Sequence, residues 1–315
     1  MLTRPPGGAP GPEPEDRWVS AHVFTGHPLD LVLSALVPEA VAELRQRGLA
    51  DRFFFLRHWQ GGPHLRLRVR LTTPAAEPSV RAALDAHATA LFRALPPSQP
   101  MSAHQYRSLA RRLSAQEPES EPGALAPNDS LAFHAYRPEH GKYGRGAALR
   151  AVEDAFATCS ELALAAVLAE WGPARRTAHC FALLTGSLDA SAPPGRPTPE
   201  VLAQYGNRRA ALLTVARAAR AAGAVDQAGA DPVSRWLAAC RSAQRQAALP
   251  ARLAGHLTHL ACNRLGVRLG QEATLRALAL LAVAESTGDD RPRRHSTRPD
   301  RSDHGHAPHD GAEPP

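Results

Sequence analysis

The stretch that decides the fold is Phe53–Leu71, which reads FFFLRHWQGGPHLRLRVRL. Two apolar runs flank a Gln-Gly-Gly-Pro break, and this pattern is typical of two antiparallel strands joined by a turn. Successive side chains of a strand point to opposite faces. The second run therefore predicts one apolar face, which must pack against helices, and one basic face made of His64, Arg66, Arg68 and Arg70.

The basic row concentrates positive charge along about 20 Å of strand. A solvent-exposed face is one interpretation, because charged side chains usually face water. Solvated strands usually mix Thr, Lys, Glu and Ser, however, whereas guanidinium groups bind carboxylates through paired hydrogen bonds. We therefore interpret the row as a surface for an anionic ligand.

The pattern on both sides of the hairpin predicts an α+β fold. Residues 18–24 read as a strand, 28–49 as one or two amphipathic helices, 80–95 as a helix and 131–136 as a short strand. This order is β-α-β-β-α-β, which predicts a mainly antiparallel sheet with covering helices in the first half.

The second half of the chain is a succession of helical patterns, beginning at residues 146–171, with breaks at 191–199 and 222–232. We expect one composite folded domain over residues 17–285, with two subdomains as the alternative. Residues 1–16 and the His- and Arg-rich residues 286–315 lack large apolar side chains in any regular pattern, which predicts disordered termini.

Composition excludes several classes of protein. The chain of 315 residues carries 37 Lys and Arg against 30 Asp and Glu, a net charge of +7. That excess fits nucleic acid or an acidic peptide equally, but the nucleotide-binding glycine loops and the aromatic RNA-binding signature are missing from the sequence. We expect no direct nucleic-acid binding and no cofactor.

The cysteines and the apolar runs indicate the compartment. The four cysteines are widely spaced without a C-x-x-C pair, which argues against a zinc site and a disulfide framework and suits a reducing cytosol. No apolar run of about 18 residues suggests a membrane span, and the N-terminus has no signal-peptide core. We expect a cytoplasmic protein. The tail histidines lack a scaffold of other ligands, so no metal site is expected.

Two further segments carry polar side chains in a pattern. The loop AYRPEHGKYGRG (135–146) gathers Glu139, Lys142 and Tyr143 after a predicted strand, where binding residues often lie. In GHLTHLACNRLGV (255–267) helical spacing places His256, His259 and Asn263 on one polar stripe. Each segment has a bland alternative, a surface turn and a structural stripe, respectively.

With these segments in view, the order WVSAHVF, FFFLRHWQGGPHLRLRV, YRPEHGKYG and HLTHLACNRLG resembles the C-terminal, glutamate-elimination domain of class I lantibiotic dehydratases. It is more similar still to the free-standing thiopeptide-type bacteriocin biosynthesis proteins. The resemblance spans Trp18 to about residue 285. It implies removal of a Cα proton and expulsion of glutamate from a glutamylated Ser or Thr of a precursor peptide.

The resemblance also implies site residues. The arginines of the family's H-[IL]-R-L-R strand match Arg66 and Arg68, its helical histidine matches His259, and the second arginine of its R-E-x-x-R-Y-G-G loop is replaced by Lys142. These four residues are the expected catalytic set. The expected substrate-binding set consists of His64, Arg70, Glu139, Tyr143, Asn263 and Arg264.

Three functions stay open from the sequence. Elimination of glutamate is the first. The second is a pyridine synthase, because thiopeptide pyridine synthases resemble the same domain and perform a formal [4+2] cyclisation of two dehydroalanines with loss of the leader. The third is a non-catalytic subunit that binds the leader peptide. The expected partners are a precursor peptide with its leader, a glutamyl-tRNA-dependent glutamylating protein and a second copy of the chain in a homodimer.

Overall fold

The computed structural model describes residues 17–115, 122–188, 196–224, 231–247 and 250–289. A four-stranded antiparallel sheet forms its first half, from β1 (Trp18–Phe24), β2 (Ala50–His58), β3 (His64–Leu71) and β4 (Ser130–His134). The strand order is β2-β3-β1-β4. The β2–β3 hairpin and the alternation along β3 are confirmed, since Leu65, Leu67, Val69 and Leu71 are buried on one face.

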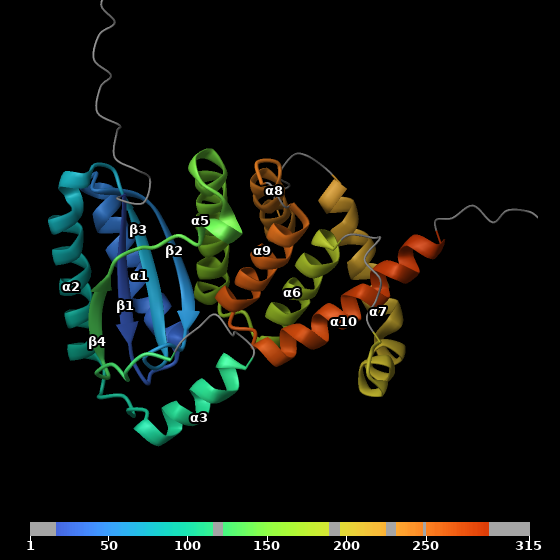
Figure 1. The fold of residues 1–315 in the computed structure, drawn as a ribbon, viewed down its shortest axis with the longest axis horizontal. Coiled ribbons are helices and arrows are strands. Elements are labelled where there is room, and N and C mark those ends of the chain that lie inside the picture. The colour runs from blue at the N-terminus through green and yellow to red at the C-terminus, as the bar shows by residue number, and fades with distance from the viewer. Residues whose placement is uncertain (1–16, 116–121, 189–195, 225–230, 248–249, 290–315) are drawn as a thin grey trace, which may run out of the picture.

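Two helices cover the apolar face of the sheet, α1 (Leu29–Gln46) and α2 (Glu77–Ala94), the latter preceded by the short 3-10 turn η2 (Pro74–Ala76). Figure 1 shows both helices on the same side of the strands. The apolar stripe of α1 includes Val32, Leu36 and Leu44, which are buried against the sheet. The predicted β-α-β-β-α-β order is therefore confirmed, with α1 as one helix that accommodates Pro38.

The sequence interpretation missed one helix, α3 (Ala103–Ser114), in the segment treated as polar. A capping box starts it: the Ser102 hydroxyl accepts a hydrogen bond from the Gln105 N–H, and the Gln105 side chain accepts one from the Ser102 N–H. This motif satisfies two N–H groups at the start of a helix. Burial of Tyr106 and Ala110 against Trp59 then fixes α3 to the rest of the fold.

Helices form the second half. After the short α4 (His140–Tyr143) come α5 (Gly146–Leu168), α6 (Pro173–Ser187), α7 (Pro199–Ala224), α8 (Pro232–Gln244), α9 (Pro250–Arg264) and α10 (Leu269–Asp289). The helix α10 continues beyond the predicted domain boundary at residue 285, to Asp289. Its last turns hold polar side chains in helical hydrogen bonds, with Ser286 and Thr287 each donating to the Val283 carbonyl. The predicted disordered segment 1–16 and most of 286–315 lie outside the described residues.

The two halves share one contiguous core of buried apolar side chains. They meet at β2, the edge strand, whose outward N–H and C=O groups need partners. The Ser160 hydroxyl of α5 accepts the N–H of Phe55 at 3.1 Å, and the Asn263 amide of α9 bonds both the N–H and the C=O of Arg57 at 2.9 Å. Side chains of the helical half thus replace a neighbouring strand. The shared core favours the expected single domain.

Among the described residues, no helix is long and apolar enough to cross a membrane. The same part of the chain holds no group of three or more His, Cys, Asp or Glu side chains arranged to bind a metal ion. The four cysteines are buried and free.

Candidate functional site

The basic row of β3 lies on the face of the sheet opposite α1 and α2. Strand pairing places His22 of β1 beside Arg66, and Phe54 of β2 beside Arg68. The four side chains of the row share a face as predicted, but each has different neighbours. Those neighbours, rather than the alternation itself, decide what each side chain can do.

At one end of the row His64 is fully buried and serves to hold Arg66. Its Nδ1–H donates to the Gly62 carbonyl at 2.8 Å, so Nε2 carries no proton and accepts from the Arg66 Nε–H at 3.2 Å. The Arg66 guanidinium also donates to the Gln60 side chain at 2.8 Å. Burial lowers the pKa of His64 to about 4. In the structure His64 positions Arg66, and the substrate-binding role expected for His64 stays a prediction.

Three more histidines surround His64. Ring centroids are 5.0 Å apart for His22 and His64, 4.3 Å for His22 and His134, and 5.4 Å for His58 and His64. Burial, followed by the charge of Arg66, lowers the pKa of both His22 and His58 to about 2. These two imidazoles and His64 are neutral at physiological pH. No local pattern predicts this cluster, because its members come from four different strands.

In the middle of the row the Arg68 guanidinium lies between two rings, 5.3 Å from the centroid of Phe54 and 4.8 Å from that of Tyr136. Its Nε–H is buried and has no hydrogen-bond acceptor among the described residues. Burial lowers the pKa of Arg68. The Tyr136 hydroxyl donates to Glu153 of α5 at 2.9 Å, which holds the tyrosine over the arginine.

A second buried guanidinium belongs to Arg264 at the end of α9. Its Nε–H donates to the Ser160 hydroxyl at 2.9 Å and its Cζ lies 5.0 Å from the centroid of the Phe156 ring, but its two Nη atoms are buried with no acceptor in the described part of the chain. Burial lowers the pKa of Arg264 to about 10, and the charge of Arg68 contributes to that shift. The two cations are thus close enough to repel each other.

Tyr143 of the 135–146 loop lies close enough to Arg68 and Arg264 for both charges to act on its hydroxyl. Its ring lies 5.3 Å from Phe156, and burial raises its pKa to about 12, so the hydroxyl keeps its proton. We call Arg68, Arg264, Tyr136, Tyr143 and Phe156 the two-arginine site. The site contains buried N–H groups of two cations that have no acceptor among the described residues, and aromatic rings surround them. This arrangement favours an anion, because a buried charge needs a counter-charge or hydrogen-bond acceptors.

The loop also carries the lysine that replaces the family's second arginine. The Lys142 ammonium lies 2.5 Å from the Glu139 carboxylate, one turn back on α4. Both residues are therefore engaged with each other, and the cation of Lys142 is largely neutralised by its neighbour. The two residues remain predicted site residues, but as an ion pair beside the two-arginine site.

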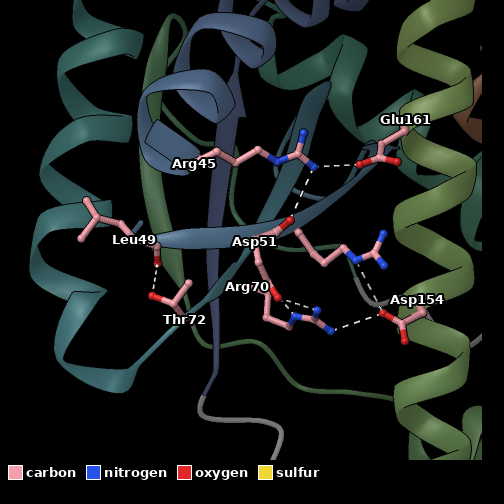
Figure 2. A network of polar contacts seen from close by, with 8 residues as sticks. Arg45, Leu49, Asp51, Arg70, Thr72, Asp154 and Glu161 are labelled. Carbon is pink, nitrogen blue, oxygen red and sulfur yellow. Dashed lines mark hydrogen bonds and ion pairs between the residues drawn. The ribbon is translucent and has the colours of Figure 1, made fainter. Parts of the chain in front are cut away.

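Arg70, at the other end of the row, has acceptors on two sides. Its guanidinium binds Asp51 through two hydrogen bonds of 2.9 and 2.7 Å and reaches Asp154 of α5 at 3.3 Å. Figure 2 shows this network together with the pair Arg45–Glu161. Arg70 therefore ties the sheet to α5. Its donors face these carboxylates in the structure, and the substrate-binding role expected for Arg70 stays a prediction.

The polar side chains along α9 also differ from one another in their neighbours. Asn263 is bonded to the backbone of β2, and the substrate-binding role expected for it stays a prediction. His259 points to α10, where its Nδ1 lies 2.8 Å from Glu272, a carboxylate only 6% exposed. His256, one turn earlier, is the histidine that faces Tyr143, at 6.3 Å between centroids. The sequence interpretation missed Glu272, which no local pattern connects to His259.

Comparisons with known proteins identify relatives of this chain. A family model described as "Lantibiotic biosynthesis dehydratase C-term" matches residues 18–283. A search of curated proteins finds no match.

Three solved structures share the fold. The pyridine synthase TbtD from thiomuracin biosynthesis has a TM-score of 0.68 at 22% identity, over 87% of this chain and 99% of that one. The tRNA-dependent lantibiotic dehydratase MibB from Microbispora sp. 107891 has a TM-score of 0.56 at 22% identity, over 92% of this chain and 29% of that one. TsrL has a TM-score of 0.55 at 18% identity, over 86% and 95%.

Proposed function

Because the chain belongs to the lantibiotic dehydratase C-terminal family, we propose that it is an enzyme that eliminates glutamate from glutamylated Ser or Thr of a precursor peptide. The reaction removes the Cα proton, forms the Cα=Cβ double bond and breaks the bond from Cβ to the ester oxygen. Glutamate leaves as a carboxylate, and dehydroalanine or dehydrobutyrine remains in the peptide.

The two-arginine site is the observation that carries this proposal. Elimination from a glutamyl ester places one carboxylate on the adduct and develops a second on the leaving group. The buried Nε–H of Arg68 and the buried Nη–H groups of Arg264 have no acceptor among the described residues, and guanidinium groups bind carboxylates strongly. Donors fixed in a low-dielectric site stabilise charge that develops during a reaction. Arg66, fixed by His64 and Gln60, is the third cation of the proposed clamp.

Proton transfer is assigned to the histidines of α9. His259 is the residue that the family resemblance implies, and Glu272 fixes its ring through Nδ1, which leaves Nε2 to take up a proton. His256 is the alternative, because it lies closer to Tyr143. Single variants of the two histidines separate these assignments, since only the true base is required for the loss of the Cα proton.

The test uses the purified chain and a glutamylated precursor peptide. We expect free glutamate and a peptide that loses the mass of glutamic acid. Arg68→Lys keeps the charge but not the forked donor, and we expect roughly a hundredfold loss of rate. Arg208→Lys, on the exposed surface of α7, is the matched control and should react like the wild type. No glutamate release by the wild-type protein would refute the proposal.

Cyclisation is the second candidate, and one observation favours it. Glu139 engages Lys142, so the loop does not present the additional free cation that elimination would use. Tyr143 keeps its proton and can donate it to an amide oxygen, as a cyclase would need. A multiply dehydrated peptide should then give a pyridine-containing macrocycle and free leader. If neither substrate reacts but the peptide binds in a salt-sensitive way, the chain is the non-catalytic leader-binding subunit.

The proposed partners follow from the proposed reaction. This chain spans 29% of MibB. We infer that a protein that glutamylates the precursor from glutamyl-tRNA supplies the substrate, and that the precursor with its leader is the peptide partner. Proposed homodimer formation is checked by measuring the mass of the purified chain in solution.

A further inference from the structure

The end of α9, which carries Arg264, closes in a motif that fixes its backbone. The Gly266 N–H donates to the Asn263 carbonyl at 2.9 Å. The Val267 N–H donates to the Cys262 carbonyl at 3.0 Å. Gly266 has a φ of 76°, so these bonds form a Schellman motif, in which a glycine in the left-handed conformation ends a helix. The motif satisfies two of the carbonyl groups at the end of α9.

Two arginines from other elements bind the carbonyl groups that follow. The Nε–H of Arg57 in β2 donates to the Arg264 carbonyl at 3.1 Å. The guanidinium of Arg176 in α6 donates to the Leu265 carbonyl at 3.2 Å. Cations are favourable at the C-terminal end of a helix, because its last carbonyl groups have no partners within the helix. The end of α9 therefore depends on side chains that β2 and α6 supply.

Asp30, in the first turn of α1, joins the two arginines. Its Oδ1 accepts a hydrogen bond from Nη2 of Arg57 at 2.5 Å, and its Oδ2 lies 2.8 Å from Nη1 of Arg176. Burial favours the neutral form of Asp30, but the charges and hydrogen bonds of the two arginines outweigh it and lower its pKa. We call Asp30, Arg57 and Arg176 the Asp30 network. It connects α1, β2 and α6 to the end of one helix.

The Asp30 network fits closely against the end of α9. A Cβ added to Gly266 would lie 3.4 Å from Cζ and 3.6 Å from Nε of Arg57, so the guanidinium packs directly on the turn. The Asn263 amide also bonds both the N–H and the C=O of Arg57 at 2.9 Å. Only 16% of the Arg57 side chain and 13% of the Arg176 side chain are exposed, so water has little access to these contacts. The network therefore fixes this turn of α9.

The fixed turn holds a side chain of the two-arginine site. The network contacts Arg264 at its backbone carbonyl, whereas the guanidinium of Arg264 extends to Ser160 and the Phe156 ring. A change in the network therefore acts on the place where the guanidinium is held. His259 lies five residues earlier on the same helix, about 7.5 Å along its axis. A displacement of about 1 Å can cost an enzyme about a hundredfold in rate.

We propose that the Asp30 network positions Arg264 for the reaction, with the Asp30 carboxylate holding the two arginines that fix the end of α9. Asp30, Arg57 and Arg176 are therefore positioning residues, which act through Arg264. The inference rests on the proposed function, because the reaction that it concerns is the release of glutamate at the two-arginine site.

The first test compares Asp30→Asn with the wild type in glutamate release. Asparagine has the same shape, but it carries no charge and turns one acceptor into a donor that faces a guanidinium. We expect kcat/KM to fall by roughly tenfold or more. Glu285→Gln is the matched control, because Glu285 bridges Tyr205 and Arg209 near the other end of α10, and its rate should stay within about twofold of the wild type. Wild-type kcat/KM in Asp30→Asn would overturn the proposal.

A double-mutant cycle separates positioning of Arg264 from a general loss of structure. Arg264→Lys removes the guanidinium on which Asp30 is proposed to act. Adding Asp30→Asn to Arg264→Lys should therefore slow glutamate release by less than about twofold further, whereas independent effects would multiply. Multiplied effects would mean that Asp30 does not act through Arg264, and the proposal would fail.

Hydrogen exchange gives a readout that does not depend on the reaction. In Asp30→Asn the N–H groups of Gly266 and Val267 should exchange roughly fivefold faster or more, while those of β1 keep their protection. Arg176→Lys keeps the charge but not the forked donor, and it should show a smaller increase at the same two groups; it replaces Asp30→Asn if circular dichroism shows that Asp30→Asn does not fold. Unchanged exchange at both groups contradicts the proposal.

The two kinds of measurement distinguish this proposal from the proposed function. If the wild type releases no glutamate, the proposed elimination fails, and the exchange of Gly266 and Val267 decides whether the Asp30 network fixes α9. If the wild type releases glutamate and Asp30→Asn does so equally fast, elimination stands and the positioning role of Asp30 is refuted.

Discussion

Replacing Arg264 by methionine should stabilise the protein while abolishing its function. Arg264 is fully buried, and two of its three guanidinium nitrogens have no acceptor among the described residues. Methionine replaces the aliphatic part of the arginine side chain and carries no charge. Replacement of a buried, incompletely satisfied ion by an apolar side chain is often neutral or stabilising.

The magnitude follows from two opposing effects. A pKa lowered from 12.5 to about 10 means that the fold destabilises the charged guanidinium by about 3 kcal/mol relative to water, although the side chain stays charged at pH 7. Against this, Arg264→Met loses the hydrogen bond to Ser160, which contributes about 1 to 2 kcal/mol. We therefore expect the free energy of unfolding to rise by about 1 to 2 kcal/mol in Arg264→Met.

The assay is urea denaturation followed by circular dichroism, with Arg176→Met as the matched control. Arg176 is also a mostly buried arginine, but it has acceptors in Asp30 at 2.8 Å and in the carbonyls of Trp171 and Leu265. Its loss removes the ion pair with the partly exposed Asp30 carboxylate and the hydrogen bonds to two backbone carbonyls, so the control should be destabilised by about 2 to 4 kcal/mol. The two variants should move in opposite directions.

The ligand supplies the second readout. An anion that binds only the folded state raises its stability in proportion to the logarithm of its concentration. Added glutamate should stabilise the wild type and leave Arg264→Met unchanged. If Arg264→Met is instead less stable than the wild type by more than about 1 kcal/mol, the guanidinium has a partner within the fold, such as the adjacent Cys159, and the argument for an anion site fails.

Three further predictions test other parts of the fold and site. His22 and His58 have a pKa of about 2 in the folded chain against an ordinary value of 6.5, so the unfolded chain binds more protons between these two values. The free energy of unfolding should therefore fall as the pH drops below about 6.5, by up to ~1.4 kcal/mol per pH unit for each histidine. His58→Phe should make this pH dependence less steep in urea titrations at about pH 7 and about pH 5.5. Asn263→Ala removes two hydrogen bonds to the edge of β2 and should cost about 2 to 3 kcal/mol in urea unfolding, and an unchanged midpoint would contradict its structural role. Glu272→Gln should slow glutamate release by roughly tenfold or more and shift the pH dependence of the rate, whereas His259→Ala should nearly abolish glutamate release. Equal rates in both variants and the wild type would exclude His259 and Glu272 from the mechanism.

Local patterns were sufficient for the layer architecture. The alternation in Phe53–Leu71 predicted the hairpin and the common face of the basic row, and both are present. Helical spacing predicted α1 and α2 on the other face. α3 was missed because its stripe of buried residues is short, with Tyr106 and Ala110 packing on a satellite cluster rather than on the main core.

The functional differences within the row were beyond sequence reasoning. Arg68 and Arg70 have the same neighbours in the sequence pattern, yet Arg70 meets two carboxylates and Arg68 meets two aromatic rings. Likewise, two adjacent residues of α9 differ completely: Asn263 caps the sheet edge, and Arg264 contributes its buried cation to the two-arginine site.

The sequence by itself determined the strands, most helices and the face on which the positive charge lies, because these follow from periodicity along the chain. Only the tertiary structure decided which charges are neutralised. An ion pair or a buried cation depends on distances between segments that are remote in sequence, and folding alone brings Arg264 of α9 beside Arg68 of β3. The row of four therefore resolves into a positioning histidine, a held arginine, a structural arginine and Arg68, whose Nε–H is the one donor of the row left buried without an acceptor among the described residues.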